Sequence, residues 1–345
     1  MEKERLYYAD VLRTAAIIAV VFVHVSGAWL TEDIIGTDAS SIMNIYSLLS
    51  KWCVPIFVML SGMFMLDLKK KITIKDIYLR YILRVFIALI VWGAFYAHFD
   101  LGYGFSISLS SITDSFIHAL SADTHYHLWF LYLMIGLYVL TPILRSFIKS
   151  AKAKERLYLI SISLIIGTII PTIEAIFKDD TLLRWVSMTH LDTLTSYIGL
   201  YVLGYHLKVT ELNKRYRNII YISAISLTVI ALIIEESFAA KLHLLNIPYI
   251  FNNLSLNNIV VATSIFIFAK DRRYKKSKLI TAISLSSFGM YLVHDYLINI
   301  LYSLGVSAID GTIYMIPLLS IAIVIISFII SYIITKIPYI GHYLA

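Results

Sequence analysis

The sequence contains few charged residues and very little cysteine, proline or glycine. Of its 345 residues, 15% are charged and 59% are hydrophobic, whereas ordinary soluble domains have about 25% and 45–50%. The single cysteine, Cys53, excludes an internal disulfide and a zinc knuckle. Together with a mean hydropathy of +0.79, these shortages exclude a water-soluble domain and indicate a protein that crosses a lipid bilayer.

Apolar stretches of about 20 residues predict ten membrane-spanning helices. They lie at residues 8–28, 41–66, 77–98, 128–148, 157–177, 193–207, 217–235, 247–269, 279–303 and 312–335. We therefore expect an all-α fold, a bundle of ten transmembrane helices that forms a single domain over residues 1–345.

The lysines and arginines between these spans predict the orientation. Alternate connections hold 22 of them, and the intervening connections hold only Lys178, Arg184 and Lys241. The larger set comprises Lys3, Arg5, Lys69, Lys70, Lys71, Lys75, Arg145, Lys149, Lys152, Lys154, Arg156, Lys208, Lys214, Arg215, Arg217, Lys270, Arg272, Arg273, Lys275, Lys276, Lys278 and Lys336. Because cytoplasmic loops are rich in these residues, we expect both termini in the cytoplasm and the chain in the inner (plasma) membrane.

The net charge of +7 is accounted for by this orientation, so no nucleic-acid partner is expected. The N-terminal segment also has the pattern of a signal peptide, with a basic start and an apolar run that ends in small residues at 26–28. Three ionisable residues within that run argue against its removal, and we expect it to remain as the first span.

Those ionisable residues are Asp10, Arg13 and His24. A charged group at the bilayer centre costs on the order of 3 kcal/mol, so each needs a partner or a purpose. Arg13 and His24 are eleven residues apart, which is about 16 Å and close to three turns of helix, so they share a face. The alternative is that the two side chains reach toward opposite membrane interfaces.

Further histidines are expected at the outer level of the membrane. The alternating helix directions place His24 and His294 in the outer half, and His125 and His127 at the outer mouth of the fourth span. Glu174, late in the fifth span, could join them. We hypothesise a cluster; the alternative is that the histidines are ordinary interfacial or bundle residues.

At the opposite membrane face, Arg80 and Arg84 lie near the start of the third span. Their i, i+4 spacing predicts that they point the same way, as two ligands of one polyanion would. The neighbouring lysines at 69–71 and 75 are explained by orientation and by anionic lipid headgroups. That explanation is weaker for two arginines within a helix.

Several segments resemble motifs of the acyltransferase-3 family of integral-membrane O-acyltransferases. Five resemblances occur in the family's order, in agreement with its ten-helix topology. They are residues 10–16 followed by His24, residues 54–62, residues 127–131 with Tyr138 and Pro142, the pair Tyr201 and Gly204, and residues 287–294.

This resemblance implies an enzyme that moves an acyl group, usually acetyl from acetyl-CoA, to a hydroxyl of a sugar or lipid-linked cell-envelope glycan. Arg13 and His24 match the family's required arginine and histidine, and the resemblance therefore implies that both are catalytic residues. Arg80 and Arg84 match its arginine pair only loosely, at a spacing one residue longer, and are assigned with Arg13 to acyl-CoA binding. His24 can act as a general base or as a nucleophile; we favour the base.

The acceptor site is expected to include aromatic and polar residues that can stack on and hydrogen-bond a sugar. They are His127, Trp129, Glu174, Tyr291 and His294. Glu174 is the candidate for orienting the catalytic ring or binding the acceptor. No metal is expected. Ser61 and Gly62 are interpreted either as a contact to the acyl chain or as a site of close helix packing.

Two alternatives to an acetyltransferase stay open. One keeps the enzyme and changes the donor, for example to succinyl-CoA; the other is a transporter or flippase for an envelope precursor or amino acid. Dependence on acyl-CoA separates the transporter or flippase from the two kinds of acyltransferase. Some relatives carry an extra hydrolase-like domain; without one, this chain is expected to transfer directly or with a separate partner. Low glycine and proline with abundant isoleucine, lysine and tyrosine suggest a bacterial source.

Overall fold

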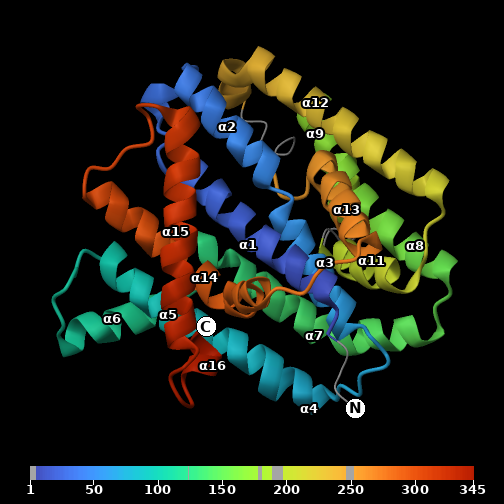
Figure 1. Cartoon of the computed structure of the whole chain (residues 1–345), viewed down its shortest axis with the longest axis horizontal. Coiled ribbons are helices and arrows are strands. Elements are labelled where there is room, and N and C mark those ends of the chain that lie inside the picture. The colour runs from blue at the N-terminus through green and yellow to red at the C-terminus, as the bar shows by residue number, and fades with distance from the viewer. Residues whose placement is uncertain (1–4, 123, 178–180, 189–196, 246–251) are drawn as a thin grey trace.

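The computed structural model describes residues 5–122, 124–177, 181–188, 197–245 and 252–345, and these residues form helices and connecting turns without a β-strand (Figure 1). The expectation of an all-α fold is therefore confirmed for this part of the chain. Outside the described residues lie Lys3, Lys178 and the first residues of the predicted spans at 193–207 and 247–269, and the side chain of Lys241 is not described either.

Helix α1 (Tyr7–Ala28) runs through the centre of the bundle (Figure 1). It packs against five other helices, which are α2 (Asp38–Ser50), α3 (Cys53–Met65), α13 (Leu256–Asp271), α14 (Lys278–Ser303) and α15 (Thr312–Ile334). Ala16, Ile17 and Val21 of α1 are completely buried. Because α1 is covered on so many sides, its polar residues must find partners inside the protein.

Seven described segments are long and apolar enough to cross a membrane. They are Tyr7–Ala28, Asp38–Met65, Ile74–Asp100, Tyr126–Ser150, Ala153–Glu174, Lys214–Glu235 and Thr312–Ile334. The other three predicted spans correspond to α11 (Tyr197–Val209), α13 and α14. Helix α13 has 16 residues, fewer than the roughly 20 that span a bilayer, and the described part of α11 has 13.

Three predicted spans contain breaks in regular α-helix, and in the span predicted at 157–177 the break is the π-helical segment Ile165–Ile169. The span predicted at 41–66 divides into α2 and α3, and Pro55 lies in the first turn of α3, where its missing N–H costs no helical hydrogen bond. The span predicted at 77–98 consists of α4 (Ile74–Asp76), a π-helical segment (Ile77–Ile82) and α5 (Leu83–Asp100). The π-helical segment changes which face the following residues occupy.

Glycines allow α3 and α11 to pack backbone against backbone. A Cβ on Gly62 would overlap the carbonyl group of Tyr201, and a Cβ on Gly204 would overlap that of Met59. Close packing of this kind is typical of small residues at crossings of membrane helices. The packing interpretation of Gly62 is therefore confirmed, and the same helix crossing requires glycine at position 204.

Helix α6 (Leu109–Leu120) covers α5, and the short turn η3 (Tyr126–Leu128) leads into α7 (Trp129–Ser150). This turn brings its side chains between the ends of α1, α5 and α14. The remaining helices surround this core: α8 (Ala153–Leu164), a π-helical segment (Ile165–Ile169), α9 (Ile170–Phe177), α10 (Thr181–Met188), α12 (Lys214–Leu245) and α16 (Gly341–Leu344).

Candidate functional site

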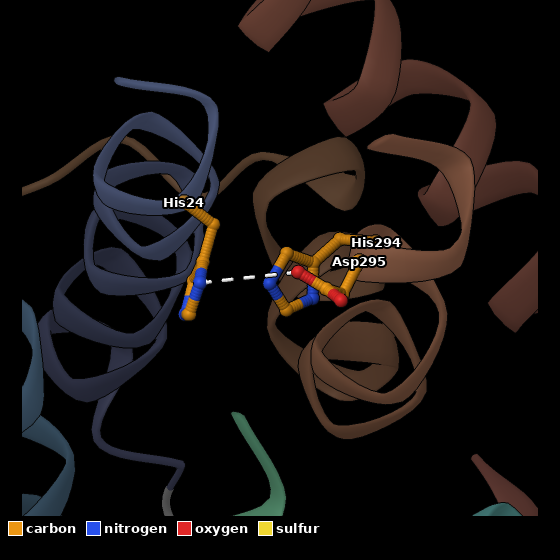
Figure 2. A group of neighbouring side chains, drawn as sticks. All are labelled: His24, His294 and Asp295. Atoms are coloured by element: carbon orange, nitrogen blue, oxygen red, sulfur yellow. Dashed lines mark ion pairs between the residues drawn. The ribbon is translucent and has the colours of Figure 1, made fainter. Parts of the chain in front are cut away.

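His24 projects from α1 toward His294 and Asp295 of α14 (Figure 2). The ring centroids of the two histidines are 4.8 Å apart, and Nδ1 of His24 lies 4.0 Å from Oδ1 of Asp295. The side chain of His24 is 18% exposed and that of Asp295 only 2%. A carboxylate this deeply buried needs strong hydrogen-bond donors.

The turn around η3 supplies those donors. Nε2 of His125 lies 2.7 Å from Oδ2 of Asp295, and the hydroxyl of Tyr126 donates to Oδ1 at 2.6 Å. Nδ1 of His125 lies 2.9 Å from a carboxylate oxygen of Asp100, at the end of α5. Asp295 is thus the centre of a network that joins α5, η3 and α14.

The two carboxylates also set the charge of His125. Burial alone would lower the pKa of His125, but the hydrogen bonds to Asp100 and Asp295 outweigh burial and raise its pKa to about 9. His125 is therefore an imidazolium at neutral pH, and both of its N–H groups donate to carboxylates. This positive charge in turn favours the ionised form of Asp295.

Tyr126 also links this network to His24, because its hydroxyl lies 3.1 Å from Nδ1 of His24. His127 and His294 complete the cluster, and both are almost completely buried. Nδ1 of His294 donates to the carbonyl of Tyr291 at 2.7 Å. Among the described residues, Nε2 of His294 and both ring nitrogens of His127 have no hydrogen-bond partner.

A cavity of about 430 Å³ runs beside this cluster, a volume typical of small-molecule sites. Arg13 and His24 both line it, so the cavity follows α1 for about 16 Å. It is lined by Arg13, Val20, Val23, His24, Cys53, Val54, Phe57, Ser61, Tyr81, Arg84, Val85, His127, Trp129, Phe130, Leu131, Met134, Tyr138, Asn253, Ser284, Leu285, Ser287, Phe288 and Tyr291. The walls are mainly apolar, with two arginines toward one end and two histidines toward the other.

Arg13 has donors to spare at its end of the cavity. Its guanidinium group donates to the hydroxyl of Ser284 at 3.2 Å and lies 3.9 Å from Asp10. The carboxylate of Asp10 is already held by two hydrogen bonds from Arg5, at 2.5 and 2.9 Å. The pairing of Asp10 with Arg13 expected from their spacing is therefore a long contact.

Arg80 and Arg84 do not point the same way, contrary to the expectation from their spacing. Arg84 lines the cavity, lies 4.9 Å from the ring centroid of Phe288 and donates to the carbonyl of Ala345 at 2.8 Å. Arg80 has a side chain that is 77% exposed and pairs with Asp76 at 3.4 Å. Arg80 lies within the π-helical segment Ile77–Ile82 and Arg84 follows it in α5, so the two are not related as i and i+4 of one α-helix.

The predicted acceptor residues are partly brought together. His127, Trp129 and Tyr291 line the cavity, and the hydroxyl of Tyr291 donates to the backbone carbonyl of His127. His294 belongs to the cluster but is completely buried behind the lining. Glu174, in α9, accepts a hydrogen bond from the backbone N–H of Leu183 in α10, so its contact is away from the histidine cluster.

The carboxylate beside His24 is therefore Asp295, which the motif at 287–294 stops short of by one residue. A carboxylate within a predicted membrane span is itself a signal of function, and that signal could have identified Asp295. Tyr126 carries no such signal, because a tyrosine beside two histidines at a membrane interface is unremarkable.

The cluster also contains two groups with the residue types of a metal site. His24, His294 and Asp295, and separately His125, His127 and Asp295, offer ligand atoms within 4.8 Å of one another. A tetrahedral zinc site holds its ligand atoms about 3.4 Å apart, whereas nitrogens of His24 and His127 lie 4.0 and 3.9 Å from Asp295. Both oxygens of Asp295 also accept hydrogen bonds. This is the arrangement of a hydrogen-bonded network.

The comparisons with known proteins agree with the motifs. A sequence model of a family described as an acyltransferase domain, the acyltransferase-3 family, matches residues 6–336. No curated protein and no solved structure matches the chain. A multi-pass membrane protein with this match is expected to transfer acyl groups. The chain therefore belongs to the acyltransferase-3 family.

Proposed function

We propose that this protein transfers an acetyl group from acetyl-CoA to a hydroxyl of a cell-envelope glycan or lipid-linked sugar, with His24 as the general base. The observation that carries the proposal is the cavity, because it joins two arginines to a histidine through the apolar interior. A cavity with an anion-binding end and a basic end suits a donor whose phosphates and thioester are far apart.

The arginines serve the phosphate end of the donor. Guanidinium groups bind phosphate through several planar donors. Nε of Arg84 is buried without a hydrogen-bond partner among the described residues, and Arg13 retains donors beyond its bond to Ser284. A ligand that accepted hydrogen bonds from both groups would satisfy them. Arg80, on the exposed side of its helix, can contribute only at longer range.

The thioester arm would extend along the apolar walls and bring the acyl carbon to His24. The acceptor hydroxyl then attacks the thioester carbonyl while His24 takes the hydroxyl proton. Collapse of the tetrahedral species breaks the carbon–sulfur bond, and His24 returns the proton to the departing thiolate. The products are an ester and CoA-SH, and His24 regains its starting state.

The aromatic and polar residues near His24 are assigned to the acceptor. Trp129 lines the cavity with 37% of its surface exposed, and an indole is suited to stacking on a sugar ring. His127 lines the same cavity with two unpartnered ring nitrogens, which are available to an acceptor hydroxyl. Glu174 stays a weaker candidate for acceptor binding, because its described contact is with α10.

The proposed setting is the inner membrane, with ten spans and both termini in the cytoplasm. In that orientation the arginine end of the cavity faces the compartment that contains acyl-CoA. The histidine end faces the compartment in which envelope glycans are modified. No metal takes part in the proposed reaction.

The test is turnover of labelled acetyl-CoA by the purified protein in lipid, compared with His24→Ala and His98→Ala variants. His98 is a matched control, because it pairs with Ser115 away from the cavity. We expect His24→Ala to lose about 10²- to 10⁴-fold in kcat with acetyl-CoA binding nearly unchanged, and His98→Ala to resemble the wild type.

Retention of turnover by His24→Ala would contradict the role of the base. If the wild-type protein consumed no acetyl-CoA but consumed succinyl-CoA or another acyl-CoA, the donor would be reassigned. If it consumed no acyl-CoA at all, the transporter or flippase interpretation would replace the enzyme.

A further inference from the structure

We infer that Tyr126 is a positioning residue that transmits the charge of Asp295 to His24, holding the proton on Nδ1 and leaving Nε2 as the basic atom. The inference rests on the proposed function for its catalytic meaning, but the proton arrangement is a property of the protein alone. It follows from counting donors and acceptors along a chain of three side chains.

Asp295 fixes the direction of the first hydrogen bond. An ionised carboxylate can only accept hydrogen bonds, so the Tyr126 hydroxyl must donate its single proton to Oδ1 of Asp295, at 2.6 Å. With its proton used, the Tyr126 oxygen can only accept from Nδ1 of His24, at 3.1 Å. A neutral imidazole carries one N–H. Nδ1 of His24 therefore carries it, and Nε2 holds a lone pair.

His125, at the second carboxylate oxygen, stabilises the ionised form of Asp295. His125 lies 2.7 Å from Oδ2 of Asp295 and 2.9 Å from Asp100, and only the doubly protonated ring can donate to both carboxylates. The side chain of Asp100 is half exposed, so this second carboxylate keeps contact with solvent. The aromatic ring of Tyr96 stacks on His125 with centroids 4.7 Å apart and holds its orientation.

The other neighbours of His24 do not offer a competing arrangement. Nδ1 of His294 donates to the carbonyl of Tyr291, and its Nε2 has no hydrogen-bond partner among the described residues, so His294 neither donates to nor accepts from His24. Nδ1 of His127 is 3.9 Å from Asp295, too far for a hydrogen bond. Tyr126 is thus the described group that connects His24 to the carboxylate.

This arrangement is suited to a base that must gain and release a proton. When Nε2 takes the proton of the acceptor hydroxyl, His24 becomes an imidazolium whose Nδ1–H still donates to Tyr126. The nearby carboxylate of Asp295, 4.0 Å from Nδ1, stabilises that positive charge in a low-dielectric interior. When the proton moves on to the thiolate of CoA, the neutral Nδ1–H form returns. In serine hydrolases a carboxylate likewise fixes the tautomer of the catalytic histidine and stabilises its imidazolium. In this protein a tyrosine hydroxyl lies between the carboxylate and the histidine.

The decisive variant is Tyr126→Phe, which removes the hydroxyl and keeps the ring. Its matched control is Tyr103→Phe, because Tyr103 donates to the carboxylate of Asp114 at 2.7 Å outside the site. We expect Tyr126→Phe to lower kcat by about 10- to 100-fold while the KM for acetyl-CoA changes by less than about twofold. Tyr103→Phe should leave both constants unchanged.

A spectroscopic measurement tests the proton position without requiring turnover. The protein is labelled with ¹⁵N-histidine in lipid, and the signal of His24 is assigned by its loss in His24→Gln. The wild type is expected to show the Nδ1–H tautomer of His24 at neutral pH. In Tyr126→Phe this signal should shift to a mixture of tautomers, and in Tyr103→Phe it should stay as in the wild type.

These readouts separate the two proposals. An Nε2–H tautomer of His24 in the wild type would overturn the inferred role of Tyr126. The same conclusion would follow if Tyr126→Phe left kcat and the spectrum unchanged while His24→Ala abolished turnover. If the wild type lacked acyl transfer altogether, the proposed function would fail. The tautomer measurement would still decide whether Tyr126 and Asp295 hold the ring.

Discussion

Arg80 and Arg84 show how the surroundings of a side chain decide its use. Arg84 is half-buried beside the cavity, and its buried Nε has no hydrogen-bond partner among the described residues, whereas the exposed Arg80 has the neighbouring Asp76 as its ion-pair partner. An exposed pair of this kind contributes little, and a buried donor without a partner costs free energy that a ligand can recover. The two arginines are therefore expected to differ in their effect on the donor.

We predict that Arg84→Gln raises the KM for acetyl-CoA by about tenfold or more, because a charged hydrogen bond is worth about 1.5–3 kcal/mol. The kcat should change much less. Arg80→Gln serves as the matched control and should change KM by less than about twofold. Steady-state kinetics in lipid measure both constants. Equal effects of the two variants would show that both arginines act only through the general positive charge of that membrane face.

The sequence carries enough information to place Arg13 and His24 on one face, because both lie in a single uninterrupted helix. It does not identify the partner of His24, since Asp295 reaches it from α14, and adjacency of distant helices is not encoded in any local spacing. Glu174 was the expected carboxylate, yet its described partner is the backbone of Leu183. Tyr126 acquires its place only because η3 folds between three helices.

At the level of elements, the crossing of α3 and α11 depends on glycine at two positions. Added Cβ atoms at Gly62 and Gly204 would overlap backbone atoms of the opposite helix. Backbone cannot move aside as a flexible side chain can, so the helices would have to separate. Ser61 of α3 lines the cavity next to this crossing, and separation would therefore disturb the cavity wall as well.

We predict that Gly62→Ala and Gly204→Ala each destabilise the protein by about 1–3 kcal/mol and lower its melting temperature by several degrees. Gly136→Ala is the matched control, because Gly136 lies within α7 with nothing near its missing Cβ. There alanine should be neutral or slightly stabilising, since it favours helix by up to about 1 kcal/mol. Thermal unfolding in detergent, followed by size-exclusion chromatography, measures the shift. Similar melting temperatures for all three variants would contradict the packing argument.

Helix existence was predictable from apolar runs, but helix interruptions were not. The segment at 77–82 has no proline or glycine that would predict an interruption, yet it forms a π-helical segment, which packs against α7. The division between α2 and α3 has a local signal in Pro55. That signal is ambiguous, because proline is tolerated both at a helix start and in kinked membrane helices.

For the whole molecule, the three predicted spans that differ from the other seven do so in length or in composition, and α13 is simply short, with 16 residues. Helix α14 has 26 residues but carries buried serines together with His294 and Asp295, so its composition is less apolar than that of a lipid-facing helix. Helix α11 is buried along most of its length. Apolar length does not separate buried from lipid-facing helices, because the central helix α1 is among the seven apolar segments and still carries Arg13 and His24. Helices enclosed by other helices can carry polar site residues.

The distribution of lysine and arginine predicts which ends of the bundle face the cytoplasm, and single cysteines can test it. Cys53 is buried, so it gives a low background for a membrane-impermeant maleimide. Ser106 and Lys275 are exposed in connections between helices, and Lys154 is exposed in the first turn of α8. We predict that Ser106→Cys is labelled in intact spheroplasts, whereas Lys154→Cys and Lys275→Cys react only after permeabilisation, because basic loops stay in the cytoplasm. The opposite pattern would place the arginine end of the cavity away from cytoplasmic acyl-CoA and would remove the orientation on which the proposed reaction depends.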